Sequence, residues 1–327
     1  MEIKILDSDS KKRCDIVLLS FLRENGYENI TRSFLQNNWE GLVSLEGMPV
    51  KPSLKVKVND SLVVDEELLK KRIEESVVEE EIVGEVSSLN IVFESDDYIV
   101  LDKPAGTVMH PGVKRKDGTL ANHVVGYLES KGEYDRMVKR GGIVHRLDRG
   151  VSGLVLFAKR YESQKFLQQK FANREVVKVY VADVLYKSVS DELRVMMEKS
   201  DIELEKALRE LEANSFECDD TWIKVEGYIH RSEMNRMKMK LSSVGRGRGY
   251  KHSLTYIKPL NSHQIIVKIE TGRMHQIRAS LEFLGMSIVG DTLYESLGGS
   301  VLPDEISLRS VLLSFEDMDG KRRVFRL

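Results

Sequence analysis

The sequence predicts an α+β protein in which the main sheet is mixed rather than doubly wound. Within residues 91–327, β-type runs outnumber the scattered helical stretches, and no repeated strand–helix–strand pattern links them. A shorter region, residues 11–64, places two helical stretches before several short β-type runs. The chain is therefore expected to form one large domain and one small module, each with its own core.

The composition is typical of a globular protein. Hydrophobic residues make up 41% and charged residues 31% of the 327 residues, and no apolar run approaches the roughly 18 residues that a membrane span needs. Charges interrupt the first residues, where a signal peptide would have its apolar core. Cys14 and Cys218 lack CxxC spacing, and the seven histidines form no zinc-binding pair. We therefore predict a cytoplasmic protein with no disulfide framework, no metal and no membrane partner.

The net charge of −2 conceals separate basic and acidic blocks. Basic residues outnumber acidic ones 16 to 7 in residues 103–180 and 8 to 2 in residues 223–251. Acidic residues outnumber basic ones 12 to 3 in residues 65–97 and 11 to 4 in residues 188–220. Basic blocks can neutralise phosphates, whereas acidic blocks stay away from a polyanion. Charge alone fits solvated faces and a nucleic-acid surface about equally well.

The first region, residues 11–64, has the pattern of a compact helix-and-sheet module. Apolar residues recur at helical spacing in KKRCDIVLLSFLREN, and a second short helix is expected to begin after Thr31, a suitable N-cap. The β-type runs that follow are separated by turn signals at residues 46–47 and 59–60. Residues 65–90 are acidic and poor in aromatics, which indicates a linker that is partly helical.

This first module resembles the S-four domain, a small RNA-binding unit. The resemblance rests on the two short helices followed by the pattern G-L-V-x-L-x-G-x-x-V-K-P-S-x-K-V-x-x-x-D at residues 41–60. It implies that the second helix and the loop before the strands face RNA. The residues it would place near RNA are Arg32, Gln36, Lys51, Lys55 and Lys57. The alternative is a small cap domain with solvated lysines.

A glycine-rich stretch, GGIVHRLDRGVSG at residues 141–153, leads into an apolar run typical of a strand. His145, Arg146 and Asp148 are therefore expected on a tight loop at the edge of a sheet, where glycines let a ligand approach the backbone. A structural loop, a phosphate-binding loop and an active site all fit this stretch. The GxxxxGK[ST] and GxGxxG spacings of nucleotide-binding loops are missing, so no nucleotide cofactor is indicated.

A second group of polar residues lies near the C-terminus, within residues 269–294. Arg273, His275 and Arg278 follow a β-type run and a Thr-Gly turn, and they lead into a helical pattern. From there Arg278 could reach a carboxylate from another part of the fold, and a nearby cation favours the ionised form that a nucleophilic acid needs. A purely structural Asp–Arg bridge would give the same pattern, so spacing alone leaves catalysis open.

Four motifs in one order resemble those of the RluA-type pseudouridine synthases, of the RluC/RluD-like kind that carries an N-terminal S-four domain. They are YIVLDKPAGTVMHPG at residues 98–112, HRLD at 145–148 followed by Ser-Gly, R-x-V-x-K-x-Y at 174–180, and TGRxHQIR at 271–278. The resemblance implies a mixed, mainly antiparallel sheet crossed by an RNA cleft. It also implies isomerisation of uridine to pseudouridine in RNA, with no cofactor and no required protein partner.

The resemblance also implies roles for individual residues. Asp148 corresponds to the family's nucleophile, Tyr180 to the tyrosine that packs on the uracil and helps remove the C5 proton, and Arg278 to the arginine that pairs with the aspartate. Attack on the ribose C1′ atom and a glycal intermediate both remain open, and either needs an ionised aspartate in a pocket that excludes water.

RNA contact is expected from both parts of the chain. Arg146 corresponds to the side chain that enters the RNA stack when the uridine is flipped out. The other expected RNA-contacting residues are His145, Arg149, Arg273 and His275, with Arg32, Lys51 and Lys55 in the first module. The family's habit favours large-subunit ribosomal RNA as the substrate. The alternatives are a tRNA pseudouridine synthase and a non-catalytic RNA-binding assembly factor.

Two features depart from the family pattern. Val151 stands where the family commonly has threonine, so a loop hydroxyl is missing. Residues 187–222 form an acidic insert with helical apolar spacing, which could pack on the domain or bind a partner. A surface excursion packed on its own domain is the simpler interpretation.

Overall fold

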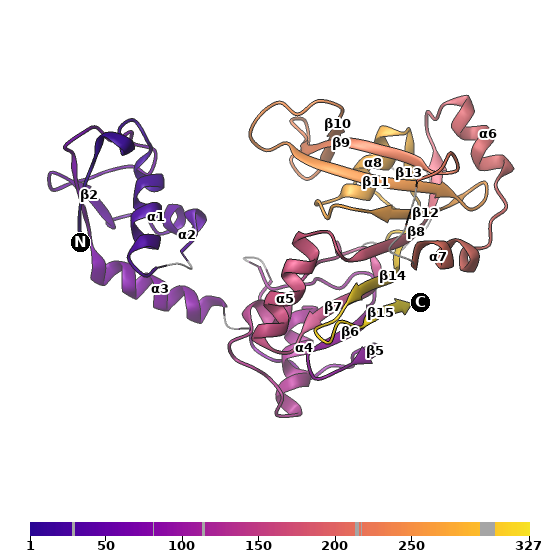
Figure 1. Cartoon of the computed structure of the whole chain (residues 1–327), viewed down its shortest axis with the longest axis horizontal. Coiled ribbons are helices and arrows are strands. Elements are labelled where there is room, and N and C mark those ends of the chain that lie inside the picture. Colours follow the sequence, from indigo (N-terminus) through magenta and orange to yellow (C-terminus); the bar gives the residue numbers. More distant parts are fainter. Residues whose placement is uncertain (28–29, 81, 113–114, 213–215, 217, 295–304) are drawn as a thin grey trace. The chain divides into compact units, whose positions relative to one another are not determined.

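The computed structural model describes the chain except residues 28–29, 81, 113–114, 213–215, 217 and 295–304 (Figure 1). The chain divides into two compact units, Met1–Glu81 and Ile82–Leu327. Within the described residues, no helix has the length and apolarity that crossing a membrane requires.

The first unit combines helices with a four-stranded antiparallel sheet. Its strand order is β1-β4-β2-β3. The elements are β1 (Glu2–Lys4), α1 (Cys14–Glu24), α2 (Arg32–Asn37), β2 (Val43–Leu45), β3 (Met48–Pro49), β4 (Ser61–Val64) and α3 (Glu66–Glu80), with a short 3-10 turn at Asp7–Asp9. Thr31 caps α2 as predicted, because its side chain accepts a hydrogen bond from the Phe34 backbone N–H at 3.1 Å. Strand β1 lies before the predicted start of the module at residue 11.

The predicted linker, residues 65–90, divides between the two units. Helix α3 belongs to the first unit, where Leu69 is fully buried in the core and the Arg72 guanidinium donates to the Glu40 carbonyl at 2.6 Å. The segment after residue 81 belongs to the second unit, where the Asn122 side chain donates to the Val83 carbonyl at 2.9 Å. The unit boundary at residues 81–82 therefore differs from the predicted boundaries at residues 64 and 91. The high charge of α3 predicted a linker, but its few apolar residues, such as Leu69, pack in the core of the first unit.

The second unit is built on an eleven-stranded sheet. Nine strands follow the order β10-β9-β11-β12-β8-β14-β7-β6-β5, while β13 pairs with β8 and β15 with β14. All of these pairs are antiparallel except β14 with β7. The strands are β5 (Ile91–Glu94), β6 (Tyr98–Lys103), β7 (Ser152–Ala158), β8 (Val177–Tyr186), β9 (Ile223–Arg231), β10 (Met239–Ser242), β11 (Lys251–Pro259), β12 (Gln264–Ile269), β13 (Met286–Ile288), β14 (Leu308–Glu316) and β15 (Arg322–Arg326). The predicted α+β class with a mixed, mainly antiparallel sheet is confirmed.

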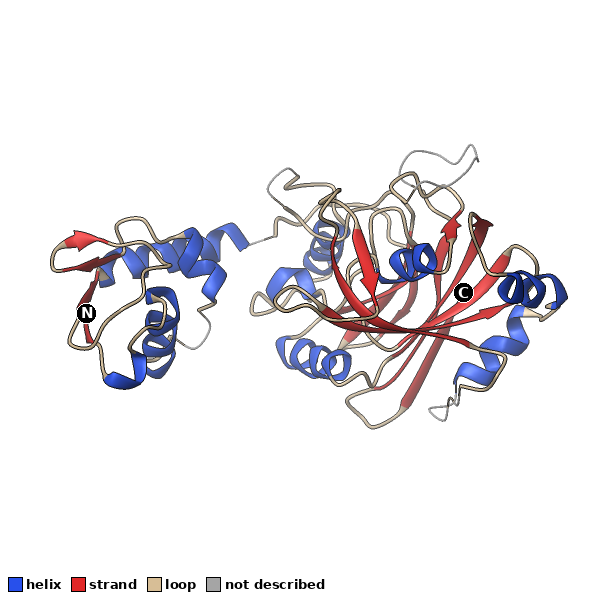
Figure 2. Cartoon of the chain, turned by 90° about the horizontal axis from the view of Figure 1, so that it is seen from above, coloured by secondary structure: helices blue, strands red, loops and turns tan. Residues whose placement is uncertain are grey.

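Helices flank this sheet (Figure 2). They are α4 (Leu120–Ser130), α5 (Tyr161–Ala172), α6 (Asp191–Lys199), α7 (Leu204–Glu212) and α8 (Gln276–Phe283), together with a 3-10 segment at Lys139–Gly142. The two faces of β8 differ because side chains alternate along a strand. Tyr180 faces the core that contains Ile277 of α8, and Val179 faces the core that contains Leu208 of α7.

The acidic insert packs on its own domain. It contains α6 and α7, as its apolar spacing predicted. Leu193 and Met197 of α6 are buried in one core, and Leu208 and Leu211 of α7 are buried in another. The simpler interpretation of the insert therefore agrees with the structure.

Candidate active site

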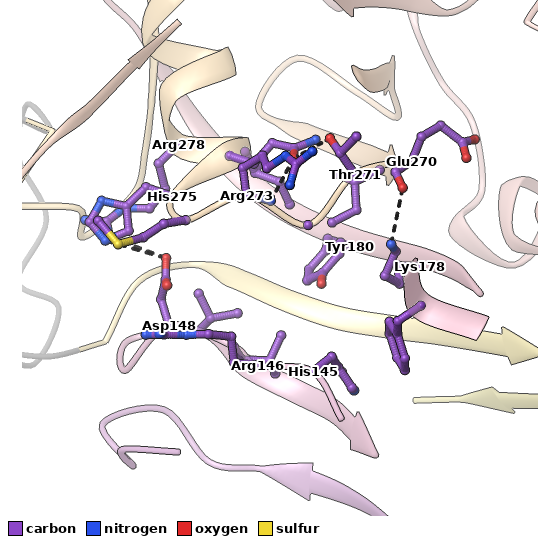
Figure 3. A pocket seen from close by; sticks show the side chains of 18 of the residues that line it. His145, Arg146, Asp148, Lys178, Tyr180, Glu270, Thr271, Arg273, His275 and Arg278 are labelled. Carbon is purple, nitrogen blue, oxygen red and sulfur yellow. Dashed lines mark hydrogen bonds and ion pairs between the residues drawn. The ribbon is translucent and has the colours of Figure 1, made fainter. Parts of the chain in front are cut away.

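One cavity of about 420 Å³ joins three of the four motifs (Figure 3). Its lining includes Arg146 and Asp148 of the HRLD loop, Lys178 and Tyr180 of β8, and Arg273, His275 and Arg278 around the start of α8. These segments are far apart in the sequence, and the sheet brings them together because β8 lies between β12 and β14. The structure thus places the predicted catalytic residues Asp148, Tyr180 and Arg278 around a common space.

The first motif supports the loop that carries Asp148. Lys103, at the end of β6, is fully buried, and its ammonium donates to the carbonyls of Pro104 (2.9 Å), Thr107 (3.0 Å) and Arg149 (3.1 Å). Burial lowers the pKa of Lys103 to about 8, and the Asp148 charge opposes that shift. The sequence analysis includes Lys103 in the first motif and predicts no role for it. The signal that could have identified it is a lysine at the end of an apolar run in the sequence.

The carboxylate of Asp148 faces two cationic or potentially cationic groups without a close hydrogen bond to either. Its Oδ2 lies 3.8 Å from Nη1 of Arg278 and 3.8 Å from Nε2 of His275. Arg278 instead binds Asp291, with two nitrogen–oxygen distances of 2.7 Å. The predicted proximity of Arg278 and Asp148 is present, but the strongest partner of the arginine is a buried aspartate that sequence reasoning missed. Asp291 lies within residues 269–294, at the GDTLY turn.

Asp291 keeps Arg278 charged inside the protein. Burial opposes the positive charge of Arg278, but the hydrogen bonds and charge of Asp291 outweigh burial and raise the pKa of the guanidinium. The Arg278 guanidinium also lies over the Tyr294 ring, 4.8 Å from its centroid. Arg278 is therefore a fixed cation beside Asp148.

His275 is held by Tyr294 at the start of α8. Its backbone is left-handed, with φ of 53°, and its Nδ1 lies 3.3 Å from the Tyr294 hydroxyl. That hydroxyl also donates to the Met239 carbonyl at 2.9 Å. Burial lowers the pKa of His275, against the opposing effect of Asp148. At neutral pH the positive charge beside Asp148 therefore comes from Arg278 rather than from His275.

Tyr180 and Lys178 project from β8 toward the same cavity (Figure 3). Tyr180 is buried, and burial together with the Asp148 charge raises the pKa of its phenol. The phenol is therefore protonated at neutral pH. Burial lowers the pKa of Lys178 to about 8, while Glu270 opposes that shift. The Lys178 ammonium lies 3.5 Å from the backbone carbonyl of Glu270.

The side chains predicted to contact RNA near the cavity differ in how they are held. Arg146 is exposed on the cavity lining, whereas His145 is tied to β7, because its Nε2 accepts a hydrogen bond from the Leu156 backbone N–H at 2.9 Å. Burial lowers the pKa of His145 to about 3, so the ring is neutral. The guanidinium of Arg149 donates to the Gly106 carbonyl at 3.1 Å, and that of Arg273 donates to the His252 carbonyl at 3.0 Å. These contacts favour positioning roles for His145, Arg149 and Arg273.

Val151 occupies an apolar position. Its side chain is 3% exposed and packs in the core cluster that contains Tyr180. Its backbone N–H still donates to the Asp148 carbonyl at 3.1 Å. The loop turn is therefore kept without a side-chain hydroxyl at residue 151.

The residues predicted to face RNA in the first unit fall into two groups. Arg32 and Gln36 both bind the fully buried carboxylate of Asp15, at 2.9 Å and 2.6 Å. Lys51, Lys55 and Lys57 are exposed. Part of the predicted surface thus has a structural task within the unit.

Among the residues that the structure describes, no group of three or more His, Cys, Asp or Glu side chains is placed to hold a metal ion.

Comparison with known proteins gives a consistent result. The model of the RNA pseudouridylate synthase family matches residues 97–283. A protein of Borreliella burgdorferi named ribosomal large subunit pseudouridine synthase D is 30% identical over 267 residues, covering 80% of this chain and 72% of that protein. An uncharacterized RNA pseudouridine synthase of Chlorobaculum parvum is 33% identical over 282 residues, covering 84% and 74%. The solved structure of human RNA pseudouridylate synthase domain containing 1 shares the fold, with a TM-score of 0.51 and 20% identity over 75% of this chain and 84% of that one.

Proposed function

The chain belongs to the RNA pseudouridylate synthase family, and we propose that it converts specific uridines of large-subunit ribosomal RNA to pseudouridine without a cofactor. As a member of this family it is an RNA pseudouridine synthase. The choice of ribosomal RNA is supported by relatives such as the Borreliella burgdorferi protein, whose name specifies the large ribosomal subunit. The observation that carries the mechanism is the shared cavity of Asp148, Tyr180 and Arg278.

Asp148 is the proposed nucleophile. The reaction breaks the bond between uracil N1 and ribose C1′ and forms a new bond from uracil C5 to C1′. The carboxylate either attacks C1′ directly or removes a ribose proton to give a glycal, and in both routes it must be ionised and accessible. Arg278 at 3.8 Å supports the ionised form, and its bidentate bond to Asp291 leaves the Asp148 oxygens open to the substrate.

Tyr180 is proposed to pack against the uracil ring while the base turns over. Because burial raises the pKa of its phenol, Tyr180 acts as a neutral ring and a hydrogen-bond donor, not as an anionic base. Assistance in removing the C5 proton would require the phenol to pass its own proton on. The phenol oxygen would take up the C5 proton while the phenol proton moves to the carboxylate of Asp148, which lines the same cavity and is free again once the C5–C1′ bond has formed.

Arg146 is proposed to take the place of the flipped uridine in the RNA stack. Its exposure beside Asp148 on the cavity lining supports this role. Flipping a base out of a stack costs a few kcal/mol, and an inserted planar guanidinium offsets part of that cost. His145, Arg149, Arg273 and His275 are proposed to hold the surrounding loops in place, with RNA contact as a second role.

The first unit is proposed to act as an S-four-like RNA-binding module. Its exposed Lys51 and Lys55 support phosphate contact. Arg32 keeps partial exposure, with 29% of its side chain accessible, while it binds Asp15. It can therefore approach a phosphate without leaving its structural partner.

The test follows tritium released from C5 of uridine. Wild-type protein and Asp148→Ala are incubated with tritiated large-subunit ribosomal RNA and, in parallel, with tritiated bulk tRNA. The proposal expects release from ribosomal RNA with wild type only. Equal background from both proteins on both RNAs would overturn the enzymatic proposal, and release from tRNA alone would overturn the substrate. Pseudouridine mapping in cells lacking the protein then identifies the uridine.

A further inference from the structure

One end of the large sheet has two chemically different faces. The strands β10, β9 and β11 form this end (Figure 1). On one face Ile229 and Leu241 pack with Ala279 of α8 and with Tyr294. Since side chains alternate along a strand, their neighbours in sequence point to the opposite face. This opposite face, defined by Tyr228, His230, Lys240, Tyr250 and His252, is called the aromatic face below.

The aromatic face carries two ring pairs in adjacent rows. Tyr228 on β9 is directly opposite His252 on β11, with ring centroids 6.1 Å apart and nearly perpendicular planes. One row further, His230 stacks on Tyr250, with ring centroids 4.3 Å apart and planes 20° apart. Lys240 on β10 is the cross-strand neighbour of His230. All four rings are partly exposed. The four rings therefore keep part of their surface accessible to a further group.

Basic side chains surround these rings. Lys240, Arg246 and Arg248 are exposed, and no ion pair joins any of them to a carboxylate within the described part of the chain. The loop that carries both arginines is held against the rings, because a Cβ atom on Gly245 would lie 3.0 Å from the Tyr228 ring. The nearby acid Glu226 is already engaged, by Lys224 at 2.7 Å and by His252 at 2.9 Å.

The aromatic face and the catalytic cavity lie on opposite faces of the sheet, since the cavity is lined by Tyr180 and by α8 residues, and the two come closest at the N-terminal end of β11. Arg273, which lines the cavity, donates from Nε to the backbone carbonyl of His252 at 3.0 Å. The backbone of His252 is therefore bonded to the loop that leads into α8. A strand of RNA leaving the cavity past Arg273 would have to pass round this end of β11, where it would meet His252 and Tyr228 first, and then His230 and Tyr250.

We propose that the aromatic face binds an unpaired RNA segment that flanks the target uridine, with bases stacking on the rings and phosphates contacting Arg246, Arg248 and Lys240. This inference rests on the proposed function. Partly exposed aromatic rings next to cations are the features that bind single-stranded nucleic acid, since every base offers a π-face and every phosphate a charge. Bases inside a duplex cannot reach such rings. The excess of positive charge around the aromatic face favours a polyanion over a protein partner.

The test compares binding of two fluorescent RNAs by full-length protein. One is a single-stranded dodecamer of adenosine and cytidine, which offers no uridine to the cavity, and the other is a blunt duplex of twelve base pairs. Tyr250→Leu should weaken binding of the single strand about tenfold and change duplex binding less than about twofold. Tyr250→Phe, which keeps the ring, should bind both RNAs as wild type does. The melting temperature of each variant confirms that it is folded.

A second pair of variants tests the cations. Arg246→Gln combined with Arg248→Gln should reduce the dependence of single-strand binding on salt by about one to two phosphate contacts. Lys321→Gln, an exposed lysine in the turn before β15, is the matched control and should leave binding unchanged. Equal weakening of single strand and duplex by Tyr250→Leu, or unchanged binding of both, would overturn the proposal, and unchanged binding would point to a protein partner for this face.

The two proposals fail in different ways. Tritium release from ribosomal RNA by wild type tests the reaction and does not depend on the dodecamer. If wild type releases tritium but the ring variants bind the single strand normally, the aromatic face is not the RNA surface, and the proposed reaction stands. If no RNA releases tritium, the proposed function is wrong whatever the dodecamer shows.

Discussion

Two aspartates, one in each unit, have cationic neighbours but are held in opposite ways. Asp15 at the start of α1 is fully buried and receives hydrogen bonds from Arg13, Arg32 and Gln36 at 2.6–3.2 Å. Asp148 keeps 21% of its side chain exposed, and its nearest cation is 3.8 Å away. The carboxylate of Asp15 is saturated by the protein, whereas that of Asp148 is open to a ligand.

The difference comes from which carboxylate accepts the hydrogen bonds of each arginine. In the first unit Arg32 directs its guanidinium to Asp15 itself. In the second unit Asp291 takes the two strong bonds of Arg278, so Arg278 supplies charge to Asp148 without blocking its oxygens. A bidentate bond to a carboxylate adds stability and fixes geometry. The first arrangement suits a structural role and the second suits catalysis, where the carboxylate must bond to the substrate.

The sharpest test of the comparison is to remove the charge from each aspartate in turn. Asp148→Asn should lower the rate of tritium release by about 1000-fold or more, because the amide is a poor nucleophile and a poor base. Stability should change by less than about 0.5 kcal/mol, since Asp148 is partly exposed and makes no close side-chain bond. Tritium release and the melting temperature measure the two effects. A large loss of stability with normal rates would reverse the assignment.

Asp15→Asn should show the converse behaviour. The amide keeps the shape of the side chain but loses the charge that Arg13 and Arg32 bind, which destabilises the first unit by about 3 kcal/mol. The rate of tritium release per folded molecule should stay within about threefold of wild type on a short RNA.

Hydrogen exchange of the amides in α1 and α2, followed by mass spectrometry on the whole chain, measures this loss unit by unit. Asp7→Asn is the matched control, because Asp7 is an exposed aspartate of the same unit. Protection in the second unit should not change in either variant. Wild-type protection of α1 in Asp15→Asn would show that the buried carboxylate contributes little.

Asp291→Asn tests whether the bond between Asp291 and Arg278 keeps the Asp148 oxygens free to bind the substrate. Without its bidentate partner, Arg278 is expected to turn toward Asp148 and bond to it directly, which would make the second unit resemble the first. We expect kcat to fall about 10- to 100-fold, equivalent to about 1.4–2.8 kcal/mol, with a smaller change in KM. Asp183→Asn is the control, because Asp183 also accepts side-chain hydrogen bonds on β8 but does not line the cavity. Equal losses in both variants would indicate general destabilisation.

The sequence predicted the parts of the molecule that depend on local pattern. The Thr31 cap, the helices of the insert and the loop position of Asp148 follow from residue types at short spacing, and the structure contains them. The meeting of Asp148, Tyr180 and Arg278 came from the family resemblance, since no local pattern sets distances between segments more than 30 residues apart.

The remaining features depend on long-range packing. Asp291 and Tyr294 act through Arg278 and His275, and nothing in GDTLY distinguishes them from turn residues. Lys103 becomes informative once its burial against three carbonyls is known. Leu69 fixes α3 to the first unit although most of its neighbours are charged, so composition alone placed that helix in a linker. Burial and the choice between alternative partners are properties of the folded chain.

A pH dependence should also separate the two units. Burial raises the pKa of Asp15, but hydrogen bonds from Arg13, Gln36 and Arg32 outweigh burial and hold the pKa at about 2, below the ordinary value of 3.8. A lowered pKa in the folded state stabilises the protein above the unfolded value and stops doing so as the pH falls through the folded value. The first unit should therefore lose about 2 kcal/mol between pH 4 and pH 2 through this group. Exchange protection of α1, corrected for intrinsic rates, should fall over this range in wild type and in Asp7→Asn. In Asp15→Asn this part of the decrease should be absent, and an unchanged decrease would show that other carboxylates control the acid stability of the first unit.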